Sequence, residues 1–219
     1  MIIPCTPLTD RSPHPSSPLP CVLKSGDHGP INSWDRQPFV TLYGLHTGIA
    51  SALMAPRNIT RNFLVGNYGG GNGAIDNDDG SVYYRNNHNF LVFGHQKFKV
   101  GSIESYGNVM AYVSDFGANP WRATGHAIGQ PNRMYDNYVV FNPVGSQQYH
   151  NQDEWNATNN TLFGSHVVLP SVQRQSEPVL SLEQWQAKDP KHHDVGSTVT
   201  TTLPVGADII AEAKKLLQG

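Results

Sequence analysis

Asn89-Phe90-Leu91-Val92 is one of five short stretches in which an asparagine precedes three or four apolar or aromatic residues. The other four are Asn62-Phe63-Leu64-Val65, Asn108-Val109-Met110-Ala111-Tyr112, Asn137-Tyr138-Val139-Val140 and Asn160-Thr161-Leu162-Phe163. The leading asparagines lie 27, 19, 29 and 23 positions apart, a mean of 24.5. Each stretch is rich in β-forming side chains and is bounded by Gly, Asn, Asp or Pro, so each predicts a short strand between turns.

A short strand about every two dozen residues, with no helical pattern between the strands, disfavours βαβ units and predicts a parallel β-helix. In that solenoid each coil stacks on the previous one at the strand spacing of roughly 4.8 Å. Equivalent asparagine side chains of successive coils can then form a hydrogen-bonded ladder at a sharp turn. The alternative is an antiparallel sandwich, for which turn signals are expected about every 8–12 residues. The long gaps in this chain favour the β-helix.

The composition agrees with an all-β fold and excludes several classes of protein. Of 219 residues, 21 are Gly, 18 are Asn and only 15% are charged. A helical bundle or coiled coil would instead be rich in Ala, Glu, Lys and Leu. A hydrophobic content of 38% supports a core and excludes a disordered chain. The net charge of −2 predicts no nucleic-acid partner, and no stretch reaches the roughly 18 apolar residues of a membrane span.

The N-terminal part differs from the rest of the chain. Residues 1–22 are rich in Pro and Ser and predict a disordered arm, which leaves residues 23–219 as a single domain. Cys5 and Cys21 lie in or beside this arm, where they could form a disulfide or remain free thiols. The first residues lack the charged and apolar regions of a signal peptide.

The C-terminal part predicts two short helices. Ser181 and Gln184 have the spacing of a capping box, which would start the first helix. Apolar residues at helical spacing predict a second helix near residues 207–218. A β-helix must cover its open end, so we expect these helices to form a cap. A partner-binding helix is the alternative.

Several phrases in the chain resemble those of right-handed parallel β-helix proteins of the pectin-lyase-like superfamily. They are Ser25-Gly26-Asp27-His28-Gly29-Pro30, Asn32-Ser33-Trp34-Asp35-Arg36-Gln37-Pro38, Asn67-Tyr68-Gly69-Gly70 and Asp76-Asn77-Asp78-Asp79-Gly80-Ser81. The resemblance covers roughly residues 24–219 and implies a right-handed solenoid, a polysaccharide partner and an extracellular location. Relatives are commonly longer, so the chain resembles the C-terminal part of such a protein.

The acidic residues Asp76, Asp78 and Asp79 form the first candidate site. They lie in a Gly-rich turn just before a predicted strand, which would present their carboxylates on the surface. Carboxylate oxygens can bind Ca²⁺, although the spacing does not match an EF-hand loop. Two of the carboxylates could instead act as general acid and base on a glycosidic bond. The structural alternative is that these residues satisfy backbone N–H groups of the turn.

The second candidate is the basic pair Lys97 and Lys99, which alternation places on one face of a strand one coil after the acidic residues. A lysine there could neutralise a uronate carboxylate or, as a base, remove the C5 proton in a lyase reaction. The resemblance implies that acids and bases on adjacent coils act together on acidic sugars. Two solvated lysines on an outer face are the alternative.

A substrate-binding group is expected from Trp34, Asp35, Arg36 and His95, in which the indole could support a sugar ring. Packing of the tryptophan and an ordinary Asp–Arg ion pair would explain the same residues. These candidates predict a polysaccharide lyase or glycoside hydrolase acting on an acidic glycan. A non-catalytic carbohydrate-binding module and the C-terminal fragment of a longer β-helix protein are the rival hypotheses.

Overall fold

The structure of the chain is a computed structural model. It describes residues 29–33, 56–66, 73–78, 81, 83–98, 103–118, 132–144, 147–150, 156–167, 169, 179–189, 191 and 193–218. The expected N-terminal arm, with Cys5 and Cys21, lies outside these residues.

The described strands form three sheets in which every neighbouring pair of strands is parallel. Sheet A contains β1 (Ile31–Ser33), β4 (Ile75–Asn77), β7 (Gln96–Phe98), β10 (Asp115–Ala118) and β13 (Gln148–His150). Sheet B contains β2 (Arg57–Thr60), β5 (Tyr84–Asn87), β8 (Ile103–Tyr106), β11 (Arg133–Tyr135) and β14 (Asn156–Thr158). Sheet C contains β3 (Phe63–Val65), β6 (Phe90–Val92), β9 (Val109–Val113), β12 (Tyr138–Phe141), β15 (Thr161–Phe163) and β16 (Thr198–Thr200).

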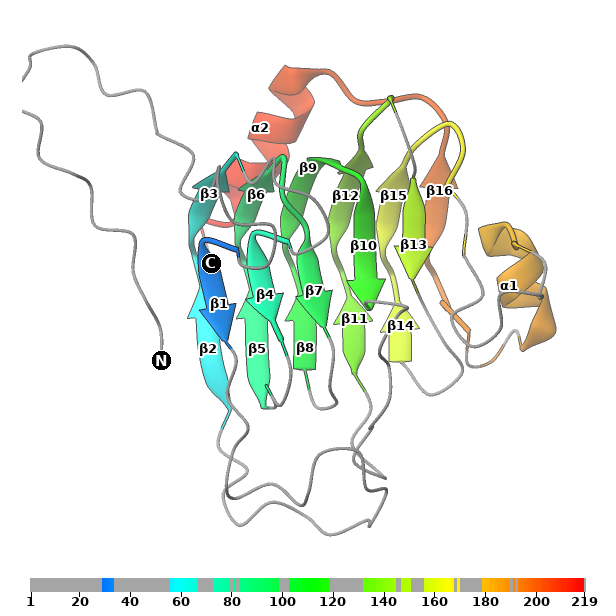
Figure 1. The fold of residues 1–219 in the computed structure, drawn as a ribbon. Coiled ribbons are helices and arrows are strands. Elements are labelled where there is room, and N and C mark those ends of the chain that lie inside the picture. Colours follow the sequence, from blue (N-terminus) through cyan, green and yellow to red (C-terminus); the bar gives the residue numbers. More distant parts are fainter. Residues whose placement is uncertain are drawn as a thin grey trace, which may run out of the picture.

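The chain visits the three sheets in strict rotation from β1 to β15, and each circuit adds one strand to each sheet (Figure 1). This all-β arrangement is compatible with a parallel β-helix and rules out the antiparallel sandwich. All five asparagine-led stretches supply consecutive strands of sheet C, as their repeat predicts.

The predicted asparagine ladder is present where the chain turns from sheet B to sheet C. Side-chain Nδ2 atoms donate to the Oδ1 atom of the next asparagine over 2.9–3.0 Å, linking Asn62, Asn89, Asn108, Asn137 and Asn160 in that order. All members except Asn62 also donate Nδ2 to backbone oxygens of sheet B at 2.9 Å. Each buried side-chain amide is therefore both donor and acceptor. The ladder can continue from coil to coil without leaving a buried asparagine side chain unpaired.

The residue before each ladder asparagine has a positive φ, from 52° at His88 to 59° at Gly107. The other residues in this position are Arg61, Gly107, Asp136 and Asn159. A single left-handed residue bends the chain sharply, which separates sheet B from sheet C within one step. At Gly107 an added Cβ would approach the His88 ring at 3.2 Å, so this position also has limited space.

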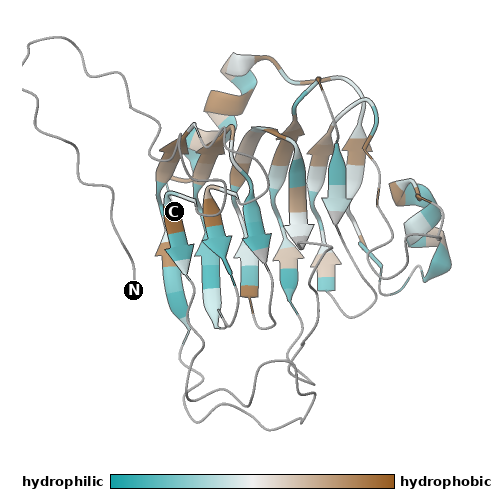
Figure 2. Cartoon of the chain, viewed as in Figure 1, coloured by the Kyte–Doolittle hydropathy of each residue, from teal (hydrophilic) through white to brown (hydrophobic). Residues whose placement is uncertain are grey.

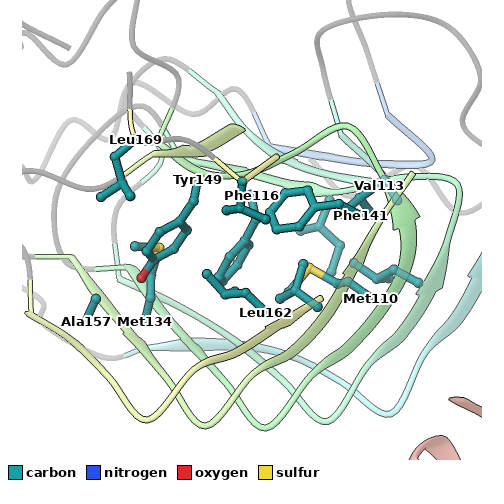
Figure 3. Close-up of a cluster of buried hydrophobic side chains, with 14 of the residues drawn as sticks. Met110, Val113, Phe116, Met134, Phe141, Tyr149, Ala157, Leu162 and Leu169 are labelled. Atoms are coloured by element: carbon teal, nitrogen blue, oxygen red, sulfur yellow. The ribbon is translucent and has the colours of Figure 1, made fainter. Parts of the chain in front are cut away.

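The core lies between the three sheets. Each coil contributes one layer of inward-facing side chains to it. Figure 3 looks along the stacked coils and shows Met110, Phe116, Met134, Tyr149 and Leu162 pointing into this space. These side chains are 0% exposed. Phe116 and Tyr149, on neighbouring strands of sheet A, stack with ring centroids 5.8 Å apart.

The two helices cover different parts of the molecule. Helix α1 (Leu182–Lys188) begins with the predicted capping box, and its Leu182 and Trp185 join the main core at the C-terminal end (Figure 1). Helix α2 (Gly206–Lys215) lies against the outer face of sheet C, where Ile209 packs with outward-facing apolar residues. Figure 2 shows hydrophobic residues along strands of sheet C and a largely hydrophilic β5 in sheet B. Neither helix of the described part of the chain is long and apolar enough to cross a membrane.

Candidate functional site

The first candidate site lies on the outer face of sheet A, where one residue from each of three strands forms a polar row. Asp76 of β4 pairs in register with Asn32 of β1 on one side and with Lys97 of β7 on the other. Ile75 belongs to the core, so alternation directs Asp76 to the opposite face. Asp76 and Lys97, from neighbouring coils, therefore lie side by side on this face.

The row is joined by short polar contacts. Asn32 donates Nδ2 to Asp76 Oδ2 over 3.0 Å, and Lys97 Nζ lies 3.2 Å from Asp76 Oδ1. Lys97 Nζ also lies 3.7 Å from Oδ1 of Asp78, two residues further along on the same face. We call Asp76, Asp78 and Lys97 the acid–base cluster.

The acid–base cluster is buried, contrary to the surface position expected from the Gly-rich sequence around it. The side chains of Asp76, Lys97 and Asp78 are 0%, 2% and 7% exposed. In such an environment each charge depends on its partner, because an isolated buried ion is very costly. The alternative in which Lys97 is a solvated surface lysine is therefore wrong, and the turn alternative does not account for the contact between two strands.

His95 and Asp115 extend the site towards solvent. His95 Nδ1 lies 4.0 Å from Asp115 Oδ2, and their side chains are 11% and 26% exposed. Ser114 donates a hydrogen bond to the same carboxylate. Alternation places His95, directly before β7, and Asp115, the first residue of β10, on the same face as Lys97. The partly exposed Asp115 carboxylate makes this the accessible edge of the acid–base cluster.

A calcium ion does not fit the described part of this site. Calcium takes about six to eight oxygen ligands. At this site the Lys97 ammonium already contacts the carboxylates of Asp76 and Asp78, which would otherwise be the ligands. Among the residues that the structure describes, no three His, Cys, Asp or Glu side chains form a group suited to a metal. Asp79, the third predicted ligand, lies outside the described residues, as do Lys99, Trp34, Asp35 and Arg36.

A second polar surface, on the outer face of sheet B, was missed by the sequence analysis. Two rows cross the sheet there. The charged row is Asn58, Arg85, Glu104, Arg133 and Asn156, and the tyrosine row is Thr60, Asn87, Tyr106, Tyr135 and Thr158. A signal was available, because these residues stand four and two positions before the five ladder asparagines. Aligning the repeats on the asparagines would have placed each set in one row.

No protein-family model, curated protein or solved structure matches the chain.

Proposed function

We propose that the chain is a right-handed parallel β-helix of the pectin-lyase-like superfamily that acts on an acidic polysaccharide at the outer face of sheet A. The observation that carries the proposal is the contact of one ammonium with two carboxylates from a neighbouring strand. An apolar side chain could replace a buried ion pair at little cost to stability. Buried charges of this kind are therefore candidates for function rather than for architecture.

Hydrolysis is better supported than elimination at this site. Elimination would require Lys97 to accept the C5 proton of a uronate on a free lone pair, yet its Nζ is ion-paired with two carboxylates. Hydrolysis requires two carboxyl groups, one to protonate the leaving glycosidic oxygen and one to activate water. Asp76 and Asp78 supply such a pair: the one that carries a proton gives it to the leaving glycosidic oxygen, and the other, as a carboxylate, takes a proton from the attacking water, while Lys97 stays in contact with both.

A second candidate function, a non-catalytic carbohydrate-binding module, is favoured by the burial of the acid–base cluster. Asp76 is 0% exposed, and its two oxygens contact Asn32 and Lys97. A carboxylate held in this way stabilises its surroundings without reaching a substrate. In this second candidate the sugar contacts only the accessible edge at His95 and Asp115.

The resemblance also supports an extracellular location, and the run of acidic residues that ends at Asp79 supports a Ca²⁺ requirement. We include both in the proposal as properties to be tested with the protein itself.

The experiment is incubation of the full chain with a panel of uronate and neutral glycans, with and without Ca²⁺. New reducing ends without absorbance of an unsaturated uronate would support hydrolysis, and new absorbance would support elimination. Binding without either product would favour the carbohydrate-binding module. Absence of both binding and products across the panel would overturn the proposal.

A further inference from the structure

The outer face of sheet B carries an accessible excess of positive charge. Arg85 Nε lies 3.1 Å from Glu104 Oε2, and Arg133 Nη1 lies 3.9 Å from Glu104 Oε1. The side chains of Arg85 and Arg133 are 43% and 54% exposed, whereas that of Glu104 is 24% exposed. Two guanidinium groups thus share one carboxylate, and the Nη groups of Arg85 remain donors for a ligand. Exposed arginine forks suit planar carboxylates.

An aromatic stack adjoins the charged row on the same face. The rings of Tyr106 and Tyr135 lie 4.9 Å apart with an angle of 2° between their planes. On the other side of Tyr135, the neighbour in register is Thr158, which has no ring. That face of the Tyr135 ring is therefore placed beside a small side chain, where a flat sugar ring could stack.

The Tyr135 hydroxyl remains a neutral hydrogen-bonding group over the physiological range. Burial raises the pKa of Tyr135, Glu104 and Tyr106 raise it further, and Arg133 and Arg85 oppose the shift. The phenol can then donate to a sugar or carboxylate oxygen next to the guanidinium groups. The two rows of this face act as one polar surface.

The spacing of the face fits a polymer better than a single small ion. Arg85 and Arg133 stand on strands separated by β8, so their positions are roughly 9.6 Å apart along the stack. One strand spacing is close to the length of one sugar residue in an extended polysaccharide. A chain running along the stack would therefore present carboxylates of alternate residues to Arg85 and Arg133.

We propose that the outer face of sheet B is a binding surface for a uronate polysaccharide, in which Arg85 and Arg133 contact the carboxylates and Tyr135 contacts a sugar ring. The class of ligand rests on the proposed function, but the surface is separate from the acid–base cluster of sheet A. This surface would hold one part of the polysaccharide while another part of the same polysaccharide molecule reaches sheet A. An acidic peptide would use the arginines but not the Tyr135 ring or the regular spacing.

The test is calorimetric titration of the full chain with hexamers of galacturonate, glucuronate and guluronate. Arg133→Gln is expected to weaken binding of the preferred hexamer about tenfold through loss of a charge-assisted hydrogen bond. Tyr135→Ala is expected to weaken it several-fold, and the fully methyl-esterified hexamer is expected to bind at least tenfold more weakly. Lys214→Gln on α2 is the matched control, because it removes one exposed charge from another face and should leave affinity unchanged.

The outcomes separate this surface from the proposed function. Wild-type affinity in both Arg133→Gln and Tyr135→Ala overturns the surface, even if the wild-type protein cleaves the glycan. Weakened binding in these variants of a protein that cleaves nothing supports the surface and counts against the reaction. Equal or tighter binding of hexaglutamate, or no binding of any uronate hexamer, also overturns it.

Discussion

The asparagine ladder and the acid–base cluster are both buried polar groups, but they obey different rules. The ladder repeats in every coil, since a neutral amide can donate to one neighbour and accept from the other. Among the described residues, the acid–base cluster is confined to β4, the residue Asp78 that follows it, and β7, and its charges need partners of opposite sign. The repeating neutral ladder therefore stabilises the fold, whereas the acid–base cluster is not needed to form the coils and is the part that we assign to function.

Breaking the charged cluster should have the largest effect on stability. Lys97→Met leaves the carboxylates of Asp76 and Asp78 without their shared cation, and we expect a loss of about 3–5 kcal/mol in the free energy of unfolding. Urea denaturation measures this value. The double variant Lys97→Met with Asp76→Leu should recover a large part of the loss, because it removes a carboxylate together with the cation. No recovery would show that the ion pair itself is essential to the fold.

Breaking the ladder at its centre should cost somewhat less. Asn108→Ala removes the acceptor of Asn89 and the donor to Asn137 and to the Asn86 carbonyl, so several buried groups lose partners. We expect a loss of about 2–4 kcal/mol by urea denaturation. The control is Asn62→Ala at the half-buried end of the ladder, for which about 1 kcal/mol or less is expected. Equal losses in the two variants would contradict a cooperative ladder.

Tyr149 and Asp194 provide a third buried polar group, in which one carboxylate accepts from neutral donors. Tyr149 donates its hydroxyl to Asp194 Oδ1 over 2.6 Å, and Trp185 of α1 donates to Oδ2 over 3.1 Å. Burial, and then the charge of Asp194, raises the pKa of Tyr149 well above its usual value. The unfolded chain therefore loses this proton first, so the associated stability is complete below about pH 10 and is lost as the pH rises further.

This pH dependence can be measured by urea denaturation at about pH 8 and about pH 11. Tyr149→Phe should lose about 1–2 kcal/mol at the lower pH and should show a smaller alkaline loss than the wild-type protein. If both proteins lost the same free energy of unfolding at the higher pH, other tyrosines would be responsible for the pH dependence.

A small expected effect tests the backbone turn that carries the ladder. Gly107 has a φ of 59°, but the equivalent residues of other coils include Asp136 and Asn159 with similar values. Gly107→Ala should therefore cost only about 1–2 kcal/mol, from the left-handed backbone and the approach to His88. Thermal or urea denaturation will measure it. A loss larger than that of Asn108→Ala would place the main constraint in the backbone rather than in the ladder.

The sequence predicted the parts of the fold that recur and missed the parts that do not. The five asparagine-led strands and their ladder were predictable because each coil repeats the same local chemistry. The strands of sheet A and sheet B vary in composition from coil to coil, so only their position relative to the asparagines identifies them. Figure 1 shows that position as the constant rotation from sheet A to sheet C.

The candidate site was predictable in its pairing but not in its environment. Alternation and the coil length brought Asp76 beside Lys97, as the pattern indicated. The Gly-rich sequence around Asp76 wrongly suggested an exposed turn, whereas Asp76 lies within the buried strand β4. The arginines and tyrosines of sheet B carried no recognisable motif, and only the register of the strands gathers them on one face.

The central claim is that the ladder holds the fold while the acid–base cluster acts on an acidic glycan. The most direct measurement is the release of reducing ends from the best uronate substrate by the wild-type protein, Asp76→Asn and Asn62→Ala. We predict release by the wild-type protein and by Asn62→Ala, and a loss of at least a hundredfold, roughly, in folded Asp76→Asn, since one carboxyl group is removed from the pair. Wild-type activity in Asp76→Asn would contradict the claim, as would a wild-type protein that releases no reducing ends.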